Sequence, residues 1–152
     1  MKKQKLIIEQ LDKKLHKFYD LTEVLIPPEG WIFSIRSAIK MSLRQLGKRL
    51  NITAQSVKEI ETREKNGTVS INVLRQVAQA LDMKFIYGFI PKSKTLESMI
   101  EDRANELAKE IVLRTSTTMR LEDQENLPDR IKKSIIDKAQ EIKQEMPRYL
   151  WD

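Results

Sequence analysis

Several side chains in the first half of the chain have the chemistry needed to bind DNA. Ammonium and guanidinium groups attract phosphate, and the candidate phosphate contacts are Lys40, Arg44, Lys48, Arg49 and Lys65. The carboxamide of Gln55 can donate and accept hydrogen bonds at once, so it can pair in two places with the edge of an adenine. Each cation can equally be a solvated surface charge, so these side chains need a structural element that presents them together.

The segment that carries these residues has the pattern of two short helices joined by a turn. Ser42 with Gln45 three residues later has the form of a capping box, which predicts a helix over 42–50. Thr53 can cap a second helix over 53–63. The lengths and spacing are typical of a helix-turn-helix, in which the second helix enters the major groove and the first crosses the backbone.

Helical periodicity also dominates the rest of the chain. Apolar residues at three- and four-residue spacing predict an amphipathic helix over 3–23, with an apolar stripe made by Leu6, Ile7, Leu11, Leu15, Phe18 and Tyr19. This helix is followed by Pro27, Pro28 and Gly30, and consecutive prolines fix φ and remove backbone donors. Further helices are predicted over 31–40, 70–82, 94–123 and from Pro128 onward.

Residues 84–90, KFIYGFI, are the one segment with strand character. Aromatic and β-branched side chains favour a strand, and Pro91 would end it. A lone strand leaves both edges without partners, so it must pair with another chain, be covered or fail to form. We expect it to pair across a two-fold axis in a homodimer.

The composition excludes several classes of chemistry. The 152 residues include no Cys and one His, His16, which leaves no thiol nucleophile, zinc cluster or Ser-His-Asp triad. We therefore expect no enzymatic activity, cofactor or metal. Residues 1–52 carry 11 basic and 5 acidic side chains, an excess equal to the whole net charge of +6, which favours a polyanionic partner. No apolar run approaches the ~18 residues of a membrane span, so we expect a soluble, cytoplasmic protein.

Residues 31–82 resemble the Cro/C1 (XRE) repressor-type helix-turn-helix through two runs, MSLRQLGKRLNITAQSVKEIE and INVLRQVAQALD. The resemblance implies a core of five helices. It also implies a structural ion pair between Arg36 and Glu61, which would tie the first helix of the domain to the recognition helix.

The same resemblance assigns contacts to the recognition helix. Thr53 and Lys58 would lie near the DNA backbone, and the base-facing side chains would be Ala54, Gln55, Ser56 and Glu59. Ala54 can offer only a methyl contact, and Glu59 repels phosphate unless it accepts from a cytosine. We therefore expect a specificity that is modest or shared with DNA shape.

Across most of its length the chain resembles the family called mobile mystery protein A. The motifs that carry this resemblance are, in order, QLDKKL, PPEGWIFSIRSAIKMSLRQLGKRL, LRQVAQALDMKFIYGFIP and TTMRLEDQ. The resemblance implies a mobile-element protein encoded beside a Fic-domain protein, which is an AMP-transferring enzyme, in an arrangement similar to a toxin and its antitoxin.

Fic antitoxins carry a helix with Ser or Thr, three further residues, Glu, and then Gly or Asn. Thr118 and Glu122 fit the first two anchors, whereas Asp123 replaces the last. Four-residue spacing puts both side chains on one helical face, where the carboxylate can pair with an arginine that would otherwise hold the ATP γ-phosphate. The same spacing is common in helices, and Glu122 can instead be a solvated charge.

Together these patterns predict an all-α protein in three parts. They are an N-terminal amphipathic helix over 1–26, a five-helix Cro/C1-type helix-turn-helix domain with one terminal β-strand over 27–91, and a C-terminal helical region over 92–152 for partner binding or dimerisation. We expect a DNA-binding antitoxin and autorepressor that binds double-stranded DNA as a homodimer and neutralises a Fic-type toxin. The alternative is a stand-alone helix-turn-helix repressor of a mobile element or prophage, with no toxin partner.

Overall fold

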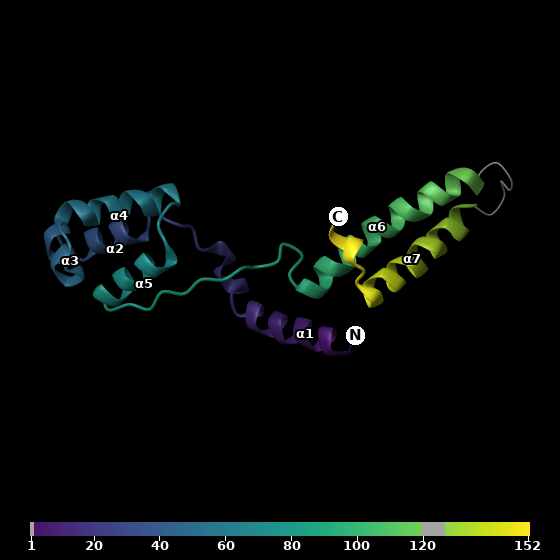
Figure 1. Cartoon of the computed structure of the whole chain (residues 1–152), viewed down its shortest axis with the longest axis horizontal. Coiled ribbons are helices and arrows are strands. Elements are labelled where there is room, and N and C mark those ends of the chain that lie inside the picture. Colours follow the sequence, from purple (N-terminus) through teal and green to yellow (C-terminus); the bar gives the residue numbers. More distant parts are fainter. Residues whose placement is uncertain (1, 120–126) are drawn as a thin grey trace. The chain divides into compact units, whose positions relative to one another are not determined.

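All regular secondary structure in the described part of the chain is helical (Figure 1). The computed structural model describes the backbone of residues 2–119 and 127–152, and the side chains of residues 2–115 and 128–152. Its elements are the α-helices α1 (Lys2–His16), α2 (Trp31–Ala38), α3 (Leu43–Leu50), α4 (Ala54–Asn66), α5 (Ile71–Ala80), α6 (Leu96–Met119) and α7 (Leu127–Glu145), and the 3₁₀ helices η1 (Tyr19–Glu23) and η2 (Arg148–Trp151). Within that described part, no helix is both long and apolar enough to cross a bilayer.

The chain divides into two compact units, each with its own hydrophobic core. The central unit comprises Glu23–Tyr87, and the flanking unit combines Met1–Thr22 with Gly88–Asp152. The central unit therefore contains α2 to α5, and the flanking unit contains α1, η1, α6, α7 and η2.

The central unit is organised around four buried apolar side chains, one from each of its helices: Ile32, Leu46, Val57 and Val77. Local capping sets where three of these helices begin. The hydroxyls of Ser42, Thr53 and Ser70 accept hydrogen bonds from the backbone N–H three residues later, at the starts of α3, α4 and α5. The helix starts that the sequence predicts at these three positions are confirmed.

The flanking unit is built on α6 and α7, which pack side by side along their length (Figure 1). Its core joins the two helices to the C-terminal residues through Ile100, Ala104, Leu107, Ala108, Ala139, Ile142 and Leu150. Small alanines let the two helices approach closely. Arg103 holds the last residues in place, because its Nε donates to the carbonyl of Leu150 at 2.6 Å and an Nη donates to that of Asp152 at 2.7 Å.

Helix α1 joins the flanking unit through few contacts. The carboxylate of Asp12 accepts from the backbone N–H of Leu96 at 2.7 Å, so it caps the start of α6. Ile8 packs against the core, although no residue of α1 is fully buried. The predicted apolar stripe is largely exposed at Leu6, Ile7 and Leu11. The predicted helix over 3–23 is interrupted after His16 and resumes only as η1.

The predicted β-strand over 84–90 is wrong: these described residues have no regular secondary structure. They lie at the junction of the two units, where the backbone of Gly88 passes the ring of Phe18 so closely that a Cβ would lie 2.9 Å from it. Ile86 and Tyr87 are exposed, and Phe89 is 79% exposed. Residues with strand propensity form a stable strand only when a neighbouring strand supplies hydrogen bonds, and the described part of this chain provides no such strand.

The predicted five-helix core is also wrong, because the central unit has four α-helices. Helix α5 ends at Ala80, and Asp82 then adopts a left-handed conformation with a φ of 59°. The residues that follow are aromatic and β-branched and have low helix propensity. They form no fifth helix.

Candidate nucleic-acid interface

Helices α3 and α4 are separate and joined by a tight turn. Ser42 and Gln45 form a complete capping box at the start of α3, with hydrogen bonds of 3.1 and 2.8 Å. Asn51 ends the helix in a left-handed conformation with a φ of 56°, a conformation that asparagine tolerates well. Thr53 then caps α4 through the N–H of Ser56 at 3.1 Å.

Gly47 allows this turn to fold back onto α3. The N–H of Ile52 donates to the carbonyl of Gly47 at 2.9 Å. A Cβ on residue 47 would lie 2.7 Å from the carbonyl oxygen of Ile52, which is backbone and cannot swing aside. Glycine is therefore required at this position by the backbone of the turn itself.

Helix α4 has one buried face and one exposed face. Val57 and Glu61 are buried against the unit. Gln55, Lys58 and Glu59 are exposed, so their side chains are available to an outside partner. Three- and four-residue spacing places these exposed positions on the same side of the helix.

Ala54 and Ser56 are half-buried. The hydroxyl of Thr53 donates to that of Ser56 at 2.9 Å, so both hydroxyls are engaged in capping α4. The first turn of α4 therefore offers Gln55 as its most accessible hydrogen-bonding side chain.

The predicted phosphate contacts fall into two groups. Lys40, Arg44 and Lys48 are exposed and form no ion pair with the residues that the structure describes. Arg49 donates to the carbonyl of Ala80 at 3.1 Å, at the end of α5, and Lys65 pairs with Glu29 at 3.1 Å. The first three cations are thus the ones available to an outside anion.

The predicted ion pair between Arg36 and Glu61 is present. Arg36 Nε lies 2.5 Å from Glu61 Oε1, and an Nη lies 3.2 Å from Oε2, so the contact is bidentate. A further Nη donates to the carbonyl of Met41 at 2.9 Å. Both charged groups are nearly buried, with side-chain exposures of 11% and 8%. The pair joins α2 to α4, and a bidentate contact restricts their relative orientation.

Glu64 supplies a second connection between α2 and α4. Its carboxylate accepts from the backbone N–H groups of Trp31 at 3.0 Å and Ile32 at 2.8 Å, so it caps the start of α2 from a distance of more than 30 residues in the sequence. Gly30 precedes α2 with a φ of 87°, and a Cβ there would lie 2.7 Å from the same carboxylate. Sequence reasoning missed Glu64. The one available signal was the lack of a capping side chain at residue 30.

Replacing Glu64 with alanine is expected to destabilise the central unit by about 1–2 kcal/mol, because two N–H groups at the start of α2 lose their charged acceptor. The measurement is urea unfolding followed by Trp31 fluorescence in a Trp151→Phe background, since Trp31 lies in the central unit. Glu59→Ala removes an exposed carboxylate from the same helix and is the matched control. Equal stability of the two variants would contradict the capping role.

The residues assigned to toxin inhibition lie at the edge of what the structure covers. The backbone of Thr118 belongs to α6, but its side chain is not among those described, and Glu122 lies outside the described residues altogether. Among the residues that are described, no group of three His, Cys, Asp or Glu side chains is placed to hold a metal ion.

Comparison with known proteins finds no family model that matches the chain, no curated protein and no solved structure.

Proposed function

We propose that the central unit binds double-stranded DNA and that the chain acts as a transcriptional repressor. One observation carries the proposal: a short capped helix and a tight turn precede α4, and the exposed face of α4 presents Gln55 while its opposite face is buried. A helix of this size fits the major groove, where a glutamine can pair with adenine N6 and N7.

The basic residues of the central unit have complementary roles in this proposal. The exposed cations of the predicted backbone contacts that form no ion pair with a described residue are left for phosphate groups, and they are Lys40, Arg44, Lys48 and Lys58. Contacts of this kind fix the register of a protein on the duplex. Arg49 and Lys65 contribute instead to the stability of the unit through their contacts with Ala80 and Glu29. Arg36, Glu61 and Glu64 hold α4 in position but do not contact the DNA.

The proposal includes a homodimer, since helix-turn-helix proteins of this kind read two half-sites. Exposed apolar side chains near the two junctions of the units support it. Leu25 is 86% exposed and Ile26 is 71% exposed, and after α5 the exposed apolar residues are Met83, Ile86, Tyr87 and Phe89. Large apolar groups left in water in such number favour association with another protein surface.

The narrower proposal is that the repressor is also the antitoxin of a Fic-type enzyme. It rests on the resemblance of four sequence motifs to the mobile mystery protein A family. The flanking unit has its own core and would be the part that binds the enzyme, with Thr118 and Glu122 as the inhibitory residues.

Selection of duplexes from a random pool tests DNA binding directly. We expect enrichment of one sequence, and an affinity for it that falls steeply with salt. If Lys40, Arg44 and Lys48 each neutralise one phosphate, a triple substitution by glutamine lowers the slope of log K against log salt by about 3 units per protomer. Fluorescence anisotropy at several salt concentrations measures this slope. Failure to enrich any sequence, or an unchanged slope, would contradict the proposal.

A further inference from the structure

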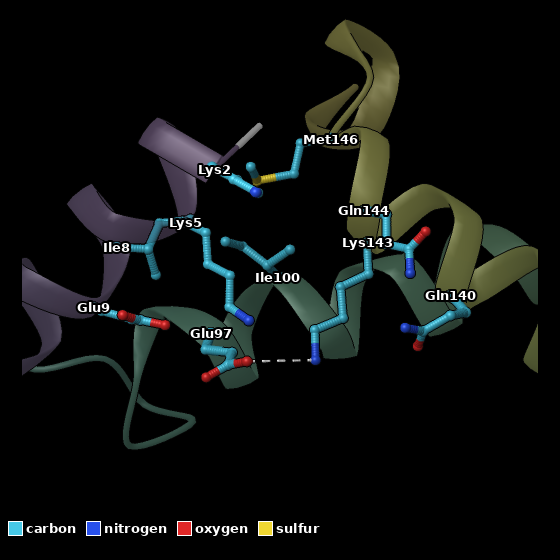
Figure 2. A pocket seen from close by; sticks show the side chains of 10 residues that line it. All are labelled: Lys2, Lys5, Ile8, Glu9, Glu97, Ile100, Gln140, Lys143, Gln144 and Met146. Carbon is cyan, nitrogen blue, oxygen red and sulfur yellow. Dashed lines mark ion pairs between the residues drawn. The ribbon is translucent and has the colours of Figure 1, made fainter.

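A pocket of about 620 Å³ lies within the flanking unit, and none of the residues assigned to DNA binding lines it (Figure 2). Its walls come from α1, from the first turns of α6 and from the last turns of α7. This volume lies within the range of about 300–1,000 Å³ that is typical of small-molecule sites.

The floor of the pocket is apolar. It is formed by Ile8 of α1, Ile100 of α6 and Met146, which follows α7. Figure 2 shows Ile100 projecting between α1 and the end of α7. Ile100 belongs to the buried core of the flanking unit, and Ile8 and Met146 pack against that core. The core therefore holds the three side chains of the pocket floor in place.

The rim of the pocket carries three ammonium groups, and they are not equivalent. Lys143 pairs with two carboxylates, that of Glu97 at 3.6 Å, which also lines the pocket, and that of Glu101 at 3.4 Å, which does not. Lys2 and Lys5 form no ion pair with any described residue, and both side chains extend from α1 into the space between α1 and the α6–α7 pair (Figure 2).

The remaining polar groups are two amides and one more carboxylate. Gln140 and Gln144 of α7 can each donate a hydrogen bond to an oxygen at the rim. Glu9 also lines the pocket and offsets one of the two unpaired ammonium groups. Among the residues that line the pocket, the three lysines exceed the two glutamates, Glu9 and Glu97, by one positive charge.

We propose that this pocket binds an amphiphilic anion, a small molecule with an apolar body and one carboxylate. The apolar body lies on Ile8, Ile100 and Met146, and the carboxylate lies between Lys2 and Lys5. Such a ligand bridges α1 and the α6–α7 pair. Because α1 has no fully buried residue, a bridging ligand stabilises its attachment.

The test uses octanoate as the probe on the full chain, at concentrations below its micelle-forming range. Methyl resonances of Ile and Met are followed by NMR during the titration. We expect saturable shifts at Ile8, Ile100 and Met146, with none at Ile136, which is exposed on α7 and outside the pocket. Amide exchange in α1 should slow when octanoate is bound.

Two comparisons separate the charge from the apolar surface. Octylammonium and 1-octanol have the same chain without the negative charge, and we expect them to bind more weakly than octanoate. The double variant Lys2→Gln and Lys5→Gln should lower the affinity for octanoate by about fivefold, since two exposed ion pairs are lost. Its affinity for 1-octanol should stay unchanged. Both lysines are exposed, so the variant should fold. Absence of saturable shifts, or equal binding of all three probes, would overturn the proposal.

Discussion

Replacing Glu61 with alanine is expected to destabilise the central unit by about 3–5 kcal/mol. The substitution leaves the guanidinium of Arg36 nearly buried without a carboxylate, with the carbonyl of Met41 and the ring of Phe33, whose centroid is 5.5 Å away, as its remaining contacts. An unpaired buried charge lowers the free energy of unfolding by far more than an intact buried pair raises it, because water does not solvate the buried charge. The same substitution also leaves a small cavity beside Arg36.

The measurement is urea unfolding followed by Trp31 fluorescence in a Trp151→Phe background, which reports on the central unit alone. Glu61→Gln keeps the shape of the side chain and one acceptor, so it should cost less than Glu61→Ala. Glu59→Ala removes an exposed carboxylate from the same helix and should change stability by less than about 0.5 kcal/mol. If Glu61→Ala behaved like Glu59→Ala, Arg36 and Glu61 would not form the structural pair that ties α2 to α4.

Ile142→Ala is expected to destabilise the flanking unit by about 2–5 kcal/mol and to leave the central unit unchanged. Ile142 is 1% exposed and packs in the core that α6 and α7 share, so its truncation removes buried apolar surface and leaves a cavity. The buried residues of the central unit form a separate core and do not include this position. Unfolding followed by Trp151 fluorescence in a Trp31→Phe background measures the loss.

Ile136→Ala is the matched control, because Ile136 is an isoleucine of the same helix that is 66% exposed. A similar loss in both variants would contradict the assignment of the core.

The Ile142→Ala variant also tests the narrower proposal. We expect that this variant no longer co-purifies with a Fic-type enzyme but still binds DNA. If the variant lost both DNA binding and enzyme binding, the two activities would not belong to separate units.

The local features of the central unit could be predicted from the sequence because their partners are close in the chain. Ser42, Thr53 and Ser70 each cap a helix through the N–H three residues later, and the side-chain types at those positions define this interaction. The ion pair of Arg36 with Glu61 is a long-range contact, and its prediction depended on resemblance to the repressor-type motif.

Other long-range caps could not be predicted in this way. Glu64 caps α2 at Trp31, which lies 33 residues earlier in the sequence. Asp12 caps α6 at Leu96, which lies 84 residues later. A carboxylate in the middle of an amphipathic helix has the pattern of a solvated charge, and only the folded arrangement places a helix start beside it. Asp12 also shows why α1 belongs to the flanking unit, which apolar periodicity alone did not indicate.

The segment 84–90 shows where local propensity fails. Its aromatic and β-branched residues favour a strand, but a strand is stabilised by hydrogen bonds to a neighbour, and the residues described here supply no neighbour. The segment instead contains the chain boundary of the two units, after Tyr87, and Ile86, Tyr87 and Phe89 are exposed. In the homodimer that we propose, these side chains would contact the second copy as exposed apolar groups and not through strand pairing.

The most direct test of the central claim is the affinity of the Gln55→Ala variant for the selected duplex, measured by fluorescence anisotropy beside a duplex of unrelated sequence. We predict a loss of about 1–3 kcal/mol on the selected duplex and almost none on the unrelated one, because the carboxamide contacts a base and not the phosphates. Gln79→Ala, which removes an exposed glutamine from α5, should change neither affinity. Unchanged affinity of Gln55→Ala for the selected duplex, or an equal loss on both duplexes, would contradict the assignment of α4 as the helix that reads DNA.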